Sequence, residues 1–146
     1  MVTVKNPILT GFYPDPSICR VGEDYYLVTS SFTWFPGLPI YHSRDLTNWS
    51  LIGHALTNPK AIDFNVMSDN DGIWAPTLRY HNGTFYLITT AHGCGGNFYM
   101  TAKNPAGPWS DPVWLKDAPG IDPSLFFDVD GRCYYTGNRW DFKSAW

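Results

Sequence analysis

Two aspartates with matching neighbours are the residues of this 146-residue chain best suited to chemistry. Asp15 lies in Tyr13-Pro14-Asp15-Pro16-Ser17, and Asp122 lies in Ile121-Asp122-Pro123-Ser124-Leu125. Each proline fixes its own φ angle, and Pro16 is expected to push Asp15 into an extended conformation. A carboxylate on so stiff a backbone is preorganised to aim at a substrate. One Asp-Pro pair alone would indicate only a turn, so it is the recurrence that favours a functional role.

The chain around these aspartates repeats one plan. Strands are expected at residues 18–21, 25–30, 40–43 and 49–53, with an aromatic loop at 32–39 and a polar loop at 57–72. Ala75-Pro76-Thr77-Leu78 opens a second copy, in which Ala75 replaces the carboxylate, and Asn82-Gly83 supplies its hairpin turn. Repeats of this length with four strands each indicate propeller blades.

The predicted fold is therefore all-β, a β-propeller of four-stranded antiparallel blades. Blade 1 is expected over about 15–56, blade 2 over about 74–116, and an incomplete blade 3 from about 121 onward. A propeller needs at least about four blades to close. We expect residues 1–146 to be the N-terminal part of a propeller domain, holding its first two and a half blades.

Composition excludes several classes of partner. The net charge is −3 and the chain has no cluster of basic residues, which argues against nucleic acid as a partner. No apolar run is long enough to span a membrane. The N-terminus lacks an apolar signal region. The three cysteines, Cys19, Cys94 and Cys133, lack metal-ligand spacing. We expect free thiols and a cytoplasmic protein, or a secreted one if a signal peptide has been removed.

Four motifs occur in a fixed order, each at the start of a blade or in the loop beyond it. They are Asn6-Pro7-Ile8-Leu9 to Ser17, Tyr25-Tyr26-Leu27-Val28-Thr29-Ser30-Ser31-Phe32, Gly72-Ile73-Trp74-Ala75-Pro76 and Gly120-Ile121-Asp122-Pro123-Ser124. Together they resemble the β-xylosidases of glycoside hydrolase family 43. The resemblance covers essentially the whole chain and implies a five-bladed propeller with its active site on the central axis. It also implies inverting hydrolysis of xylosides or arabinofuranosides, with xylo-oligosaccharides or arabinoxylan fragments as substrates.

The resemblance also implies residue roles. Asp15 matches the family's general base, and Asp122 matches the aspartate that raises the pKa of the acid and orients the substrate. Phe32, Trp74 and Ala75 match residues that line the sugar pocket. An inverting glycosidase places base and acid roughly 6.5–9.5 Å apart, and a third carboxylate raises the pKa of the acid by like-charge repulsion.

The general acid of the family is a glutamate from a later blade. The single glutamate of this chain, Glu23, is expected in a hairpin turn, where it is a poor candidate for a buried acid. We therefore expect residues 1–146 to be inactive alone. The chain would need the remainder of the propeller, as downstream residues or as a partner chain.

No metal site is predicted within the chain. His92 and Cys94 have no second pair of ligands, and Asp69-Asn70-Asp71-Gly72 lacks the other ligands of a calcium loop. No cofactor is expected to be required, although a structural calcium on the axis of the complete propeller remains an open alternative. The remaining aspartates are expected to be solvated or capping residues in turns and loops.

Three hypotheses remain open from the sequence. The first is a β-xylosidase, favoured because the aromatic loop at 32–39 would narrow the pocket around a single sugar. The second is an α-L-arabinofuranosidase or arabinanase on the same fold. The third is a non-catalytic carbohydrate-binding propeller, which would not need an ionised aspartate pair on the axis.

Overall fold

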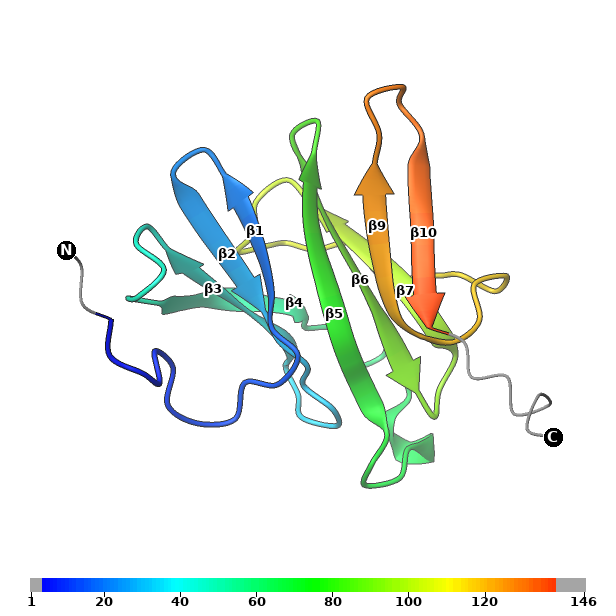
Figure 1. The fold of residues 1–146 in the computed structure, drawn as a ribbon. Coiled ribbons are helices and arrows are strands. Elements are labelled where there is room, and N and C mark those ends of the chain that lie inside the picture. The colour runs from blue at the N-terminus through cyan, green and yellow to red at the C-terminus, as the bar shows by residue number, and fades with distance from the viewer. Residues whose placement is uncertain (1–3, 139–146) are drawn as a thin grey trace, which may run out of the picture.

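The computed structural model describes residues 4–138 and contains three antiparallel sheets (Figure 1). The first has the order β1 (Ser17–Val21), β2 (Asp24–Val28), β3 (Gly37–Ser43) and β4 (Ser50–Leu56). The second has the order β5 (Gly72–His81), β6 (Thr84–His92), β7 (Gly96–Ala102) and β8 (Val113–Trp114). The third pairs β9 (Ile121–Phe127) with β10 (Cys133–Asn138). The predicted all-β class and its four-stranded antiparallel blades are confirmed.

Tight turns set the register of the inner hairpins. Val21 pairs with Asp24 across the two-residue turn Gly22-Glu23, and His81 pairs with Thr84 across Asn82-Gly83. Asn82 and Gly83 both have positive φ angles, 47° and 73°, as a turn that matches the twist of a hairpin requires. The sequence prediction of both turns is correct, and Glu23 is exposed at the first of them.

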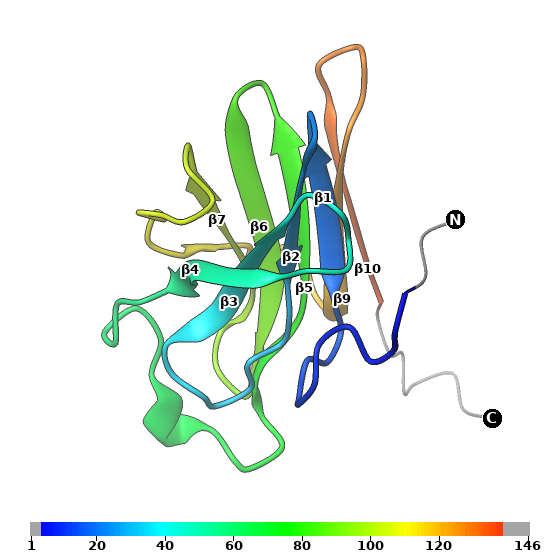
Figure 2. The ribbon, with the colours of Figure 1, turned by 90° about the vertical axis from the view of Figure 1, so that its left-hand side faces the viewer.

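The first strands of the three sheets, β1, β5 and β9, lie side by side and run in the same direction (Figure 1). Figure 2 shows β7 on one side of the molecule, with β1 and β9 on the other. Neighbouring sheets are also joined by hydrogen bonds. The backbone N–H of Leu78 in β5 donates to Ser17 Oγ at 3.1 Å, so the start of β1 is held against β5.

The second sheet is covered on both faces. Its strand β6 is buried at five consecutive positions, from residue 87 to residue 91, where a sheet with one solvated face would alternate. One hydrophobic cluster joins it to the first sheet and includes Val28, Ile40, Ile73 and Phe98. Across this boundary the rings of Tyr26 and Phe85 meet edge to face, with centroids 5.2 Å apart.

The structure extends two predicted strands. β3 begins at Gly37, inside the predicted loop, because this position lies directly against Leu56 and the Ser31 hydroxyl. β4 continues to Leu56 because Ala55 and Leu56 are buried in the core. The polar loop that follows contains a short 3₁₀ helix, Phe64–Val66, whose N-cap is Asp63. Tertiary burial, which local composition does not report, decides these boundaries.

The three cysteines are free thiols, as predicted, with Cys19 buried and Cys133 exposed. In the part of the chain that the structure describes, no helix has the length and apolarity needed to cross a membrane.

Arg79 is a clamp between the second and third sheets. Its Nε donates to the Leu125 carbonyl at 3.1 Å and its Nη2 donates to Ser124 Oγ at 3.0 Å. Because hydrogen bonds from charged groups contribute about 1.5–3 kcal/mol each, Arg79→Met should lower the free energy of unfolding by at least this amount. Thermal unfolding of the wild-type protein and the variant measures the loss.

Arg132→Met is the matched control, since the Arg132 side chain is 75% exposed and its contact with Asp130 is 3.6 Å long. It should change the free energy of unfolding by less than about 0.5 kcal/mol. Equal melting temperatures for the two variants would contradict the role of Arg79 as a clamp.

Candidate active site

In the first strand of each sheet, or just before it, the residue that precedes a proline has an unusual backbone conformation. The φ angle is 52° at Asp15, 31° at Ala75 and 53° at Asp122, and each of these residues directly precedes a proline. Positive φ is uncommon for residues other than glycine. The three positions are therefore structurally equivalent, as the sequence repeat predicted.

The prediction of an extended backbone at Asp15 is wrong. The restriction imposed by a following proline is a local preference, and the surrounding hydrogen bonds override it. Ser30 N–H donates to the Pro14 carbonyl at 3.0 Å, and Ser30 Oγ donates to Asp15 Oδ2 at 2.6 Å. Main chain and side chain are thus both held from β2, and such over-determination is what allows a strained residue to persist.

Ala75 also contacts this cluster. Its backbone N–H donates to Ser30 Oγ at 2.7 Å, so one hydroxyl joins Asp15 in the first sheet to β5 in the second. The pairing of β5 with β6 shifts register between Trp74 and Thr77, at the place where Pro76 has no N–H to give to the ladder. The resulting bulge aims the Ala75 N–H toward Ser30.

Phe32 and Trp74 lie on adjacent segments. The backbone of Phe32 exchanges two hydrogen bonds with the backbone of Ile73, at 3.1 and 3.0 Å. Trp74 is the residue after Ile73 in β5, so Phe32 and Trp74 lie on neighbouring stretches of chain. Phe32 also borders a surface pocket of about 320 Å³, lined by Phe12, Phe32, Thr33, Trp34, Asp69 and Asn70. The two predicted sugar-binding aromatics are therefore close to the Asp15 cluster.

The indole of Trp74 is supported from one side by His92. The two rings stack with centroids 3.9 Å apart and an interplanar angle of 5°. His92 Nδ1 lies 2.6 Å from Asp71 Oδ1, and Asp71 Oδ2 accepts from the Ser68 N–H. The hydrogen bond from the Ser68 N–H, and to a smaller extent the one with His92, holds the pKa of Asp71 below its usual range. Within residues 4–138, Trp74 Nε1 is buried without a hydrogen-bond partner.

Asp122 is the second residue of β9 and is exposed. A buried amide fixes the segment that leads to it. Asn97, 2% exposed, donates to the carbonyls of Ala118 and Gly120 and to the Tyr135 hydroxyl, at 2.7, 3.2 and 2.9 Å. Its own oxygen accepts from Thr90 Oγ1 at 2.6 Å. Because every polar atom of this side chain has a partner, the start of β9 is rigidly placed.

Sequence reasoning missed Ser30, His92 and Asn97 as organisers of the site. It considered His92 only as a residue that could approach a ligand, and it placed Asp71 among the solvated or capping aspartates. Spacing in the sequence carries no signal for these pairs, since Asp71 and His92 are 21 positions apart and Asn97 reaches across sheets. Among residues 4–138, no group of three His, Cys, Asp or Glu side chains is arranged to hold a metal.

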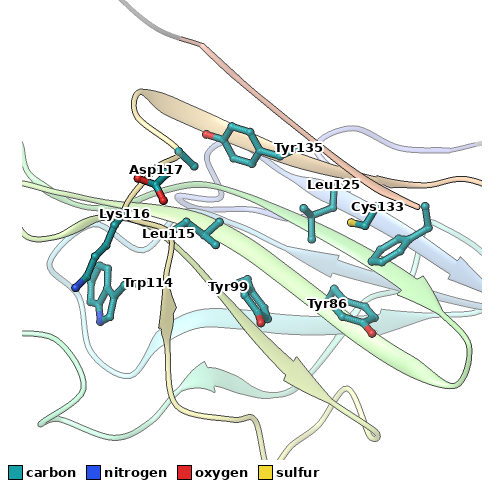
Figure 3. Close-up of a pocket in the computed structure, with 11 residues that line it drawn as sticks. Tyr86, Tyr99, Trp114, Leu115, Lys116, Asp117, Leu125, Cys133 and Tyr135 are labelled. Atoms are coloured by element: carbon teal, nitrogen blue, oxygen red, sulfur yellow. The ribbon is translucent and has the colours of Figure 1, made fainter. Parts of the chain in front are cut away.

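A larger pocket, of about 840 Å³, lies elsewhere, between the second and third sheets. In Figure 3 the side chains of Tyr86 and Tyr99 lie on one side of it, and those of Leu125 and Cys133 lie on the other. None of the predicted site residues lines it. It is a mainly apolar gap over the faces of β6 and β7, where the third sheet has only two described strands against four in the others.

Comparison with known proteins agrees with this geometry. A family model described as glycosyl hydrolases family 43 matches residues 4–145. The "Xylosidase/arabinosidase" of Butyrivibrio fibrisolvens is 57% identical over 141 residues, which are 95% of this chain and 27% of that protein. The "Non-reducing end alpha-L-arabinofuranosidase BoGH43B" of Bacteroides ovatus is 58% identical over 91% of this chain and 26% of its own length.

Solved structures give the same result. The crystal structure of xylan beta-1,4-xylosidase from Bacillus halodurans C-125 superposes with a TM-score of 0.81 at 50% identity, over 91% of this chain and 27% of that one. The chain thus spans about a quarter of the length of the relatives it matches. With a family model that matches nearly its full length, the chain belongs to glycosyl hydrolases family 43.

Proposed function

We propose that residues 1–146 form the N-terminal part of a five-bladed propeller in an enzyme that hydrolyses β-1,4-xylosidic bonds with inversion. The substrates are xylo-oligosaccharides or arabinoxylan fragments. One observation carries the proposal. Asp15 and Asp122 share the same left-handed backbone conformation at the same end of the parallel inner strands. The "Xylosidase/arabinosidase" and "xylan beta-1,4-xylosidase" names of similar proteins support it.

Asp15 acts as the general base. In an inverting reaction a water attacks the anomeric carbon from the face opposite the leaving group, and a carboxylate takes a proton from it. One oxygen of Asp15, Oδ2, is occupied by Ser30. The other, Oδ1, has no hydrogen-bond partner among the described residues and is free to accept from the water.

Asp122 stands near the general acid, a glutamate that we place outside residues 1–146. Its negative charge raises the pKa of that acid, so the acid stays protonated near neutral pH. Glu23 does not fit the role because it is exposed in the turn between β1 and β2. The proposed chemistry uses carboxylates and water and requires no cofactor.

Trp74, Phe32 and Ala75 form the wall of the sugar pocket. An aromatic face suits the C–H face of a pyranose, and His92 already covers one face of the Trp74 ring. The opposite face is the one we assign to the sugar. Ala75 occupies the position equivalent to the two aspartates, where a small side chain leaves room between them.

An α-L-arabinofuranosidase is the second candidate. The name of the Bacteroides ovatus relative favours it, and the site residues described above suit either sugar. Turnover of nitrophenyl β-xyloside and nitrophenyl α-L-arabinofuranoside by the full-length polypeptide decides between the two. Faster turnover of the arabinofuranoside would overturn the β-xylosidase assignment.

Asp15→Asn in the full-length polypeptide should leave the fold intact and lower kcat by ~10²–10⁴-fold, the usual contribution of a general base. Asparagine tolerates positive φ but cannot take a proton from water. Asp63→Asn, at the cap of the 3₁₀ helix, is the control and should retain wild-type turnover. Wild-type turnover in Asp15→Asn would refute the assignment of the base, and a sugar-binding protein without catalysis would show no turnover in any variant.

Trp74→Ala should weaken the binding of xylose, measured as product inhibition, more than it lowers the melting temperature. A core tryptophan would instead cost ~3–5 kcal/mol of stability on truncation. Trp109→Ala is the matched control, because Trp109 packs against the hydrophobic core and its Nε1 donates to the Pro105 carbonyl. If Trp74→Ala behaves like Trp109→Ala, with a large melting shift and unchanged inhibition, Trp74 is a core residue.

Residues 1–146 expressed alone should not hydrolyse nitrophenyl β-xyloside. The acid is missing from the proposed site, and a large apolar gap lies open between the second and third sheets. Within the described residues β10 has a neighbour on one side only, and an unpaired strand edge favours association with other strands. The assay compares the fragment with and without the C-terminal part of the Butyrivibrio fibrisolvens relative. Turnover by the monomeric fragment alone would disprove the placement of the acid.

A further inference from the structure

The hydroxyl of Ser30 is the only described group that hydrogen-bonds to the carboxylate of Asp15. Ser30 follows β2 and is 4% exposed. Its Oγ lies 2.6 Å from Asp15 Oδ2 and 2.7 Å from the Ala75 nitrogen. Its own N–H donates to the Pro14 carbonyl at 3.0 Å. Through its side chain and its backbone N–H, this one buried residue thus contacts the proposed base, the residue before the base and the neighbouring sheet.

The direction of these hydrogen bonds is fixed by the chemistry of the partners. A backbone N–H can only donate, so the Ala75 N–H takes one lone pair of the Ser30 oxygen. The hydroxyl has a single hydrogen, and an ionised carboxylate can only accept. The Ser30 hydrogen must therefore point at Asp15 Oδ2. Donation from Ala75 also polarises the hydroxyl, which strengthens the bond that it makes in turn.

We propose that Ser30 is the positioning residue of the reaction. It holds Asp15 Oδ2 so that Oδ1 faces the attacking water. The Ala75 N–H of the second sheet aligns the hydroxyl, so the aim of the base depends on the packing of two sheets. This inference rests on the proposed role of Asp15.

Other groups do not supply this function. Tyr13 precedes the Asp15 segment, Asp122 is the second residue of β9, and Asp71 pairs with His92 beside Trp74. In residues 4–138, none of them forms a hydrogen bond or ion pair with Asp15. The equivalent position of the second sheet, Ala75, has no carboxylate to orient and contributes its backbone N–H instead.

Ser30→Ala in the full-length polypeptide should lower kcat for nitrophenyl β-xyloside by ~10–100-fold with little change in KM, as expected for loss of a hydrogen bond to a charged group. If Ser30→Ala unfolds early, Ser30→Cys fills the same space with a weak donor and should give a loss of kcat of the same kind at smaller size.

Ser31→Ala is the matched control. Ser31 is the next residue, 8% exposed, and its Oγ accepts from the Leu38 N–H without touching Asp15. This variant should lower the melting temperature and leave kcat unchanged. A purely structural Ser30 would give the result of Ser31→Ala, which would overturn the inference.

A double-mutant cycle isolates the path through Asp15. If Ser30 acts on the carboxylate, Ser30→Ala should change kcat by less than about threefold in the Asp15→Asn background. The full fold-loss in that background would show that Ser30 acts elsewhere. Wild-type turnover in Asp15→Asn would instead overturn the proposed function itself, so the two failures are distinguishable.

Discussion

The site depends on a backbone constraint that recurs at the start of each sheet. Asp15, Ala75 and Asp122 all adopt positive φ immediately before a proline, a conformation that costs of order 1–3 kcal/mol each. The protein maintains it with hydrogen bonds from other elements, such as Ser30 to Asp15 and Asn97 to Gly120. Because the three positions repeat at the same end of parallel inner strands, we propose that their side chains face a common region.

The proposed catalytic geometry is therefore coupled to the packing of the sheets. Ser30 reaches from the first sheet to Ala75 of the second, and Arg79 reaches from the second to Ser124 of the third. Loosening either contact between sheets would displace Asp15 or Asp122 without any change in the residues next to it in the sequence.

The sequence alone predicted the repeat, the two-residue turns and the equivalence of Asp15, Ala75 and Asp122, because these features depend on local proline, glycine and aromatic patterns. It failed at the backbone of Asp15, where hydrogen bonds from Ser30 override the preference of the next proline. It also missed the stacking of His92 on Trp74. That contact depends on how β5 and β6 pair, which the spacing of residues in the sequence does not show.

The most direct test of the central claim, that the strand starts converge on one sugar, is a crystal structure of the full-length Asp15→Asn variant with xylobiose bound. The account predicts that the non-reducing xylose lies against Trp74 and Phe32, with residue 15 facing the anomeric carbon across a water and Asp122 at the same sugar. Xylobiose bound instead in the gap lined by Tyr86 and Tyr99, with residues 15 and 122 both remote from it, would contradict the account.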